Sequence, residues 1–170
     1  DLGGRLVLPG FVDCHTHAVY AGNRADEHAL RRAGATYQEI AESGGGIIRT
    51  VRAVREASVD DLVREALPRL RALLREGVTR VEIKSGYGLD LENELKMLRA
   101  IQRLRELTPQ HLTPTFLGAH AVPPGWHRAD YMDELITRML PAVAGASLAE
   151  AVDIYVESIA FDTEDRWVHI

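Results

Sequence analysis

Short apolar runs alternate with amphipathic stretches along this chain. The runs lie at residues 6–14, 78–84, 112–119 and 152–156, and each has the length and the Val, Leu, Ile or Phe content of a β-strand. Between them, apolar residues recur every three or four positions, which is the period of an amphipathic helix. Strands that are separated by helices typically form parallel β/α units. The pattern therefore predicts an α/β fold with about four such units.

Two capping boxes indicate where helices begin. In each, a Thr or Ser is followed three residues later by an acidic residue, so that the two side chains can bond each other's backbone N–H groups. Thr36 and Glu39 predict a short helix that ends at residues 43–46, a serine followed by three glycines. Ser58 and Asp61 predict the start of a second helix.

The second helix has a clear apolar stripe. Its members are Leu62, Ala66, Leu70, Leu73 and Leu74. Gly77 stands where helices commonly end, and Pro68 is expected to bend or split the helix because proline lacks a backbone N–H. A tight turn at residues 85–88 then precedes a third helix with Leu91, Leu95, Leu98 and Ile101 on its stripe, and a further helix is expected over residues 131–140.

The number of units sets the expected architecture. A closed (β/α)8 barrel requires eight strands and roughly 250 residues. With 170 residues and about four units, the chain corresponds to about half of such a barrel. No repeat, low-complexity segment or linker divides it, so we expect a single domain.

Composition excludes several classes of protein. The 46% hydrophobic content is typical of a globular domain, and a net charge of -5 disfavours nucleic acid or an anionic membrane as partner. No apolar stretch is long enough to cross a bilayer. A single cysteine, Cys14, excludes an internal disulfide and fits a reducing, cytoplasmic location.

His15 and His17 come directly after the first apolar run. Alternate side chains of a strand share a face, so the two imidazoles can bind one metal ion. Imidazole suits zinc, iron, copper and nickel. A structural site needs four protein ligands and a hydrolytic zinc usually has three, so further ligands must come from elsewhere. The alternative for so short a motif is a chance pair in a loop.

Other polar residues follow the later strands. Residues 84–87 follow the second run and His120 follows the third, and ligands of α/β proteins bind at these carboxyl ends. Glu82 and Lys84 either line the barrel or form a solvated or ion-paired face, of which the second is more common. Cys14 is expected to be a small buried residue beside the metal.

Residues 9–17, Pro-Gly-Phe-Val-Asp-Cys-His-Thr-His, resemble the first-strand signature of the amidohydrolase superfamily. These are metal-dependent hydrolases on a (β/α)8, TIM-like barrel. Six further stretches of the sequence are more specific. They resemble the imidazolonepropionase family of this superfamily and occur in the same order as in that family. They are residues 20–24, 34–37, 44–47, 82–92, 94–99 and 116–123.

The resemblance implies a reaction in histidine degradation. Water opens the cyclic amide ring of 4-imidazolone-5-propanoate and gives N-formimidoyl-L-glutamate. It also implies one divalent metal ion, zinc or iron, with His15 and His17 as its first two ligands. The family's other two ligands, a histidine and an aspartate, and the glutamate beside that histidine are not among these 170 residues.

The resemblance assigns Arg24, Tyr87 and His120 to substrate binding, and His120 also to catalysis. The Arg24 guanidinium can bind a carboxylate through two bonds, and His120 can donate to the ring carbonyl oxygen as charge develops. From the residues alone, Arg24 is more often a solvated surface arginine. Tyr87 is equally a side chain packed over its glycine turn, and His120 equally a structural histidine.

We therefore expect residues 1–170 to be the amino-terminal part of an amidohydrolase barrel domain, with the family's small β-sandwich domain largely missing. The expected partner is a small-molecule substrate, and the full-length form is expected to be a homodimer. The truncated chain alone is expected to be inactive. The alternatives are another cyclic-amide or purine-type amidohydrolase, or an inactive metal-binding fragment.

Overall fold

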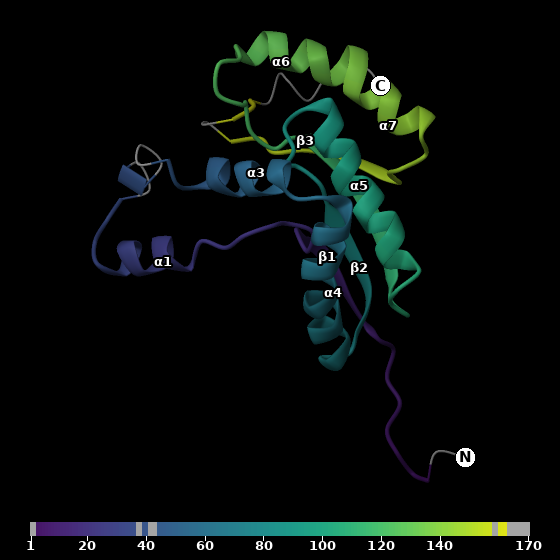
Figure 1. Cartoon of the computed structure of the whole chain (residues 1–170). Helices are drawn as coiled ribbons and strands as arrows, with labels where there is room; N and C mark the ends of the chain where they lie inside the picture. Colours follow the sequence, from purple (N-terminus) through teal and green to yellow (C-terminus); the bar gives the residue numbers. More distant parts are fainter. Residues whose placement is uncertain (1–2, 37–38, 41–43, 158–159, 163–170) are drawn as a thin grey trace.

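The computed structural model describes all residues except 1–2, 37–38, 41–43, 158–159 and 163–170. Four strands form one parallel sheet in the order β1 (Phe11–Thr16), β2 (Val78–Lys84), β3 (His111–Ala119) and β4 (Ala151–Ile154). Helical segments connect consecutive strands, as Figure 1 shows. The predicted parallel α/β architecture with four units is confirmed, and its order fits part of an α/β barrel.

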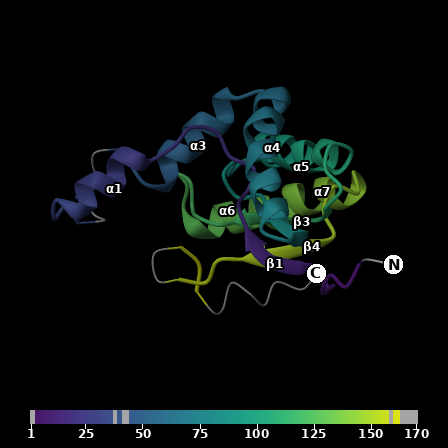
Figure 2. The ribbon, with the colours of Figure 1, turned by 90° about the horizontal axis from the view of Figure 1, so that it is seen from below.

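The helices lie mainly on one side of this sheet. They are α1 (Ala25–Arg32), α3 (Ile47–Glu56), α4 (Val59–Arg75), α5 (Leu91–Arg105), α6 (Arg128–Glu134) and α7 (Leu140–Gly145), with a π-helical turn, Leu135–Met139, between the last two. Figure 2 shows α4, α5 and α7 on the same side of the sheet. In the described part of the chain, none of the helices combines the length and apolar character needed to cross a membrane.

The core fills the space between these helices and the sheet. Val81 and Ile83 alternate along β2 and are fully buried, as are Leu98 and Ile101 of α5. The intervening residues of β2, Glu82 and Lys84, point to the opposite face because successive strand side chains alternate. That opposite face carries the polar residues, so the sheet separates an apolar core from a polar surface.

Both capping boxes form as predicted. Thr36 and Glu39 exchange hydrogen bonds, although much of the short helix that they begin lies outside the described residues. Ser58 and Asp61 cap α4, and Gly77 follows its end with a positive φ of 91°. The predicted split at Pro68 is wrong, because α4 continues unbroken through it. Proline removes one hydrogen bond, and the buried stripe on both sides of Pro68 holds the helix together.

Several boundaries differ from the predicted ones. The first strand begins at Phe11 instead of residue 6, the last strand ends at Ile154 instead of residue 156, and the helix predicted over residues 131–140 extends over 128–145. The expectation that Cys14 is buried is also wrong, since its side chain is exposed. Within the described part of the chain, β1 is an edge strand that pairs only with β2, and most of its residues are exposed.

Candidate functional site

The two histidines of the first motif lie at the carboxyl end of β1. His15 is the penultimate residue of the strand, and His17 follows it directly. Between them, the Thr16 hydroxyl donates a hydrogen bond of 2.7 Å to the Glu82 backbone oxygen of β2. This bond fixes the strand end, and the two imidazole rings lie with their centroids 5.9 Å apart.

Aromatic rings from three strand ends gather around His17. Its ring centroid lies 4.9 Å from that of Tyr87, in the loop after β2, and 4.8 Å from that of His120, directly after β3. Tyr155, directly after β4, lies 5.7 Å from His120. The structure thus brings together side chains from the carboxyl ends of all four strands, as expected for a parallel sheet.

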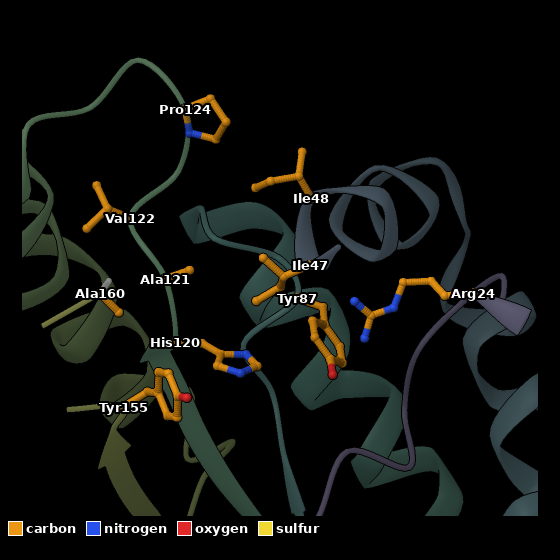
Figure 3. A pocket seen from close by; sticks show the side chains of 10 residues that line it. All are labelled: Arg24, Ile47, Ile48, Tyr87, His120, Ala121, Val122, Pro124, Tyr155 and Ala160. Atoms are coloured by element: carbon orange, nitrogen blue, oxygen red, sulfur yellow. The ribbon is translucent and has the colours of Figure 1, made fainter. Parts of the chain in front are cut away.

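A cavity of about 420 Å³ opens beside these rings. Tyr87, His120 and Tyr155 form its floor, and Ile47 and Ile48 of α3 contribute an apolar wall (Figure 3). Arg24 extends toward Tyr87 from the side (Figure 3). A second cavity, of about 240 Å³, shares Arg24 and Tyr87 with the first and is also lined by His17.

Arg24 is placed where it can bind an anion. Its side chain is 39% exposed, and its nearest ion-pair neighbour in the described residues is Glu27, at 4.0 Å. That distance exceeds a hydrogen bond, and Glu27 already accepts two bonds of 3.1 Å from the Gly46 backbone N–H. The Arg24 guanidinium therefore keeps donors available at the cavity.

Burial sets the protonation states of the cluster. It lowers the pKa of His17 to about 4, with contributions from His120, His15 and Lys84. Burial also lowers the pKa of His120 and raises the pKa of the Tyr87 hydroxyl. At neutral pH both of these imidazoles are therefore neutral, and Tyr87 keeps its proton.

The orientation of His120 follows from one hydrogen bond. Its Nδ1 lies 2.9 Å from the Gly86 carbonyl oxygen, which can only accept. Nδ1 therefore carries the proton, and Nε2 of the neutral ring has a free lone pair. A neutral His120 accepts at Nε2, and it can donate from that atom only after it has taken up a proton.

The residues present fit part of a metal site. His17 Nδ1 is buried and has no hydrogen-bond partner among the described residues, and the neutral state of the ring is the one that binds metal. Within the same part of the chain, no group of three or more His, Cys, Asp or Glu side chains is arranged to hold an ion. His15 and His17 could therefore offer two ligands to an ion, and that role stays a prediction.

Lys84 forms ion pairs on the polar face of the sheet. Its Nζ lies 2.7 Å from a Glu82 oxygen and 2.9 Å from an Asp153 oxygen, and its side chain is only 8% exposed. This confirms the expectation of an ion-paired face. The other Glu82 oxygen, Oε2, and the Thr115 hydroxyl are buried without a partner in the described residues.

Similar proteins were found for almost the whole chain. Imidazolonepropionase from Brucella suis is 58% identical over 163 residues, which are 95% of this chain and 40% of that protein. The enzymes of the same name from Hyphomonas neptunium and Paraburkholderia phymatum are 57% and 56% identical over 166 residues, 96% of this chain and 41% of each relative. Over nearly its whole length, this chain is similar to imidazolonepropionases. No family model matches it.

The imidazolonepropionase relationship confirms the resemblance found in the motifs. The chain spans about 40% of the length of the relatives it matches, so what the whole protein does is a matter of proposal. The roles of His15, His17, Arg24, Tyr87 and His120 also remain predictions.

Several residues of this site were not predicted from the sequence. Asp153 and Tyr155 come from β4 and its end, and strand alternation of the kind used for His15 and His17 offers a signal for both. Ile47 and Ile48 of the cavity had no signal in the sequence, because α3 reaches the sheet only through tertiary packing.

Proposed function

We propose that the full-length protein hydrolyses 4-imidazolone-5-propanoate to N-formimidoyl-L-glutamate, a step of histidine degradation. The observation that carries the proposal is the cavity that joins Arg24, Tyr87 and His120 beside His17. The relatives bear the name of this activity. The cavity volume also falls in the range of small-molecule sites, about 300–1,000 Å³.

Arg24 binds the propionate tail of the substrate in this proposal. Its planar fork offers two parallel N–H donors to a carboxylate, which is the strong, charge-assisted arrangement. The apolar wall from Ile47 and Ile48 excludes water from the neighbouring part of the cavity. The charged tail and the less polar ring of the substrate therefore have separate, matching surroundings.

His15 and His17 hold one divalent ion, zinc or iron, together with ligands outside residues 1–170. The neutral His17 imidazole, whose buried Nδ1 has no hydrogen-bond partner among the described residues, supports this assignment. Such an ion, when bound, lowers the pKa of a water molecule and thereby supplies a hydroxide nucleophile near neutral pH.

Tyr87 and His120 handle protons at the substrate ring. The protonated Tyr87 hydroxyl donates a hydrogen bond to the substrate. His120 accepts a proton at Nε2 from the attacking water and, as the imidazolium, donates it to the carbonyl oxygen or ring nitrogen on which negative charge develops. The bond from Nδ1 to the Gly86 carbonyl holds the ring in the required tautomer throughout.

The same proposal covers the whole molecule. Residues 1–170 form about the first half of an amidohydrolase-type (β/α)8 barrel, and chain outside them completes the barrel and the small β-sandwich domain. The full-length enzyme is a homodimer in the cytoplasm.

The test uses the full-length protein loaded with zinc or iron. N-formimidoyl-L-glutamate is measured by mass spectrometry after incubation with 4-imidazolone-5-propanoate, and an imidazolone without the carboxylate and a purine-type cyclic amide serve as comparison substrates. We expect efficient turnover of 4-imidazolone-5-propanoate and not of the two comparison substrates. Absence of that turnover, or equal turnover of the other substrates, refutes the proposal.

A further inference from the structure

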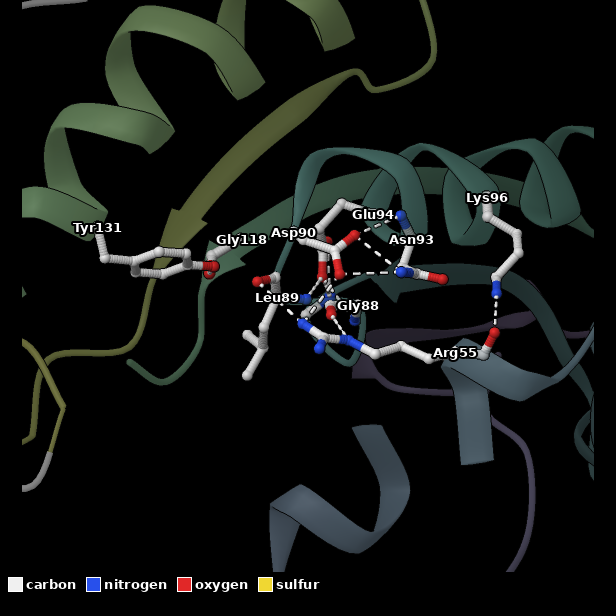
Figure 4. A network of polar contacts seen from close by, with 10 residues as sticks. Arg55, Gly88, Leu89, Asp90, Asn93, Glu94, Lys96, Gly118 and Tyr131 are labelled. Carbon is white, nitrogen blue, oxygen red and sulfur yellow. Dashed lines mark hydrogen bonds and ion pairs between the residues drawn. The ribbon is translucent and has the colours of Figure 1, made fainter. Parts of the chain in front are cut away.

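Glu94 is a fully buried carboxylate that the proposed chemistry does not use. It lies in the first turn of α5 and has no exposed surface. Its Oε1 accepts hydrogen bonds from the backbone N–H groups of Gly88 (2.8 Å) and Leu89 (2.9 Å), and Oε2 accepts from Gly86 (3.0 Å). The Ser85 hydroxyl is a fourth partner. Figure 4 shows the carboxylate surrounded by this loop.

The donors of the loop stabilise the ionised form of Glu94, whereas its burial opposes ionisation. Burial is the largest influence and raises the pKa of Glu94, and the bonds with Ser85, Leu89, Gly88 and Gly86 counteract part of that rise. The backbone partners are all donors, and a protonated carboxyl would place its own hydrogen against one of them. A buried charge without partners is very costly, so the carboxylate and the loop depend on each other.

The loop adopts a conformation that requires such support. Gly86 has φ 101° and Leu89 has φ 52°, so two of its residues lie in the left-handed region. A Cβ at Gly88 would lie 2.4 Å from the Glu94 backbone nitrogen, which shows how closely the loop passes over α5. Backbone N–H groups of one loop that converge in this way form an anion-binding concavity, and here the anion is the Glu94 carboxylate.

The same loop places two residues of the cavity. Tyr87 lies between the N–H groups that Glu94 binds, and the Gly86 carbonyl holds Nδ1 of His120. The Ser85 hydroxyl also accepts a bond of 3.0 Å from the Leu117 N–H of β3. Through the loop, Glu94 therefore connects the ends of β2 and β3.

We infer that Glu94 is a positioning residue, which holds the loop of residues 85–89 so that Tyr87 and His120 face the substrate together. The inference rests on the proposed function for the identity of that substrate. Glu94 itself touches no reacting atom.

Arg55 of α3 holds the same loop from its outer side. Its Nε donates a bond of 2.9 Å to the Gly88 carbonyl, a second donor reaches the Leu89 carbonyl at 3.3 Å, and its guanidinium pairs with Asp90 at 2.9 Å. Figure 4 shows these bonds on the side of the loop that faces α3. Arg55 thus provides an independent way to loosen the loop, through a side chain that is 40% exposed.

The experiment compares Glu94→Gln with Glu92→Gln in the full-length, metal-loaded protein. Both variants remove one negative charge from the first turn of α5, but Glu92 is exposed. In Glu94→Gln, the new side-chain amide would place its own N–H donors against the N–H donors of the loop. We expect KM for 4-imidazolone-5-propanoate to rise about tenfold or more in Glu94→Gln, which corresponds to about 1.4 kcal/mol. In Glu92→Gln, KM is expected to stay unchanged.

Hydrogen exchange provides a readout that does not depend on activity. In the protein without substrate, the peptide covering residues 85–89 is expected to exchange faster in Glu94→Gln than in Glu92→Gln, while peptides from the core of α4 do not change. A purely structural role would lower the melting temperature and leave KM of the folded enzyme unchanged, and that result overturns the inference.

A second variant covers the case in which Glu94→Gln does not fold. Arg55→Lys keeps the charge near Asp90 but loses the fork that binds two loop carbonyls, and Arg52→Lys on the exposed side of α3 is its control. In Arg55→Lys we expect a smaller rise in KM than in Glu94→Gln, together with faster hydrogen exchange of residues 85–89. In Arg52→Lys we expect neither change.

The outcomes separate the inference from the proposed function. If the wild type hydrolyses the substrate while loop exchange and KM are unchanged in Glu94→Gln and Arg55→Lys, the inference is wrong and the proposed function stands. If the wild type does not hydrolyse it, the proposed function is wrong, and exchange alone decides the inference: equal exchange in each variant and its control overturns it.

Discussion

Substitution of Arg24 by lysine tests how the cavity recognises its substrate. Arg24 borders both cavities, and its nearest described ion-pair neighbour, Glu27, is 4.0 Å away. Lysine keeps the positive charge at this position but replaces the planar fork with a single ammonium group. Arg24→Lys therefore removes the two-bond geometry while it preserves the long-range attraction for an anion.

The size of the effect follows from the bonds that are lost. A hydrogen bond to a charged group contributes about 1.5–3 kcal/mol, and lysine retains one of the two. The 39% exposure of the Arg24 side chain favours the lower end of this range, because solvent screens the interaction. A loss of about 1.4 kcal/mol lowers kcat/KM about tenfold. The tail is bound equally in the ground state and the transition state, so the change is expected mainly in KM.

The assay measures kcat and KM of the full-length enzyme with two substrates, 4-imidazolone-5-propanoate and the matching imidazolone without a carboxylate. Arg24→Lys is expected to impair only the first. Equal losses with both substrates would refute the reasoning, since they would show that Arg24 acts through the structure of the site and not through the tail.

Three further predictions concern the metal, pH and the isolated chain. His17→Ala in the full-length protein is expected to lose both metal and hydrolysis, and full metal occupancy by elemental analysis would contradict the shared site of His15 and His17. Bonds from Ser58 and Arg64 lower the pKa of Asp61 to about 2 in the folded protein. Asp61 therefore contributes stability above pH 3.8, and this stability is lost as the pH falls through 2. Asp61→Asn is expected to have a lower melting temperature than the wild type at about pH 7 and the same melting temperature near pH 2. A difference in melting temperature that does not change with pH would contradict this. Residues 1–170 alone are expected to associate or to lack a cooperative unfolding transition, without detectable turnover, because β1 and β4 are edge strands that have no further strand beside them among the described residues. A monomer with a cooperative melt and near full-length activity would contradict this.

Local patterns predicted most of the helices and strands correctly. The capping box of Ser58 and Asp61 and the glycine at position 77 marked both ends of α4, because capping involves only neighbouring residues. The predictions failed where residues distant in sequence determine where an element begins or whether it continues. Phe11 begins β1 because pairing with Val78 begins there, and α4 tolerates Pro68 because its buried stripe packs against α5 and the sheet.

The sequence by itself determined the parallel β/α order and the candidates His15, His17, Arg24, Tyr87 and His120, through strand alternation for the first pair and through resemblance for the others. Only the tertiary structure decided which nitrogen of His120 is free, that Lys84 is neutralised by Asp153, and that Glu94 supports the loop of Tyr87. Each of these depends on atoms far apart in the chain that meet only when the strands pair. The direction of a hydrogen bond and the burial of a charge depend on these tertiary contacts, so local sequence does not specify them.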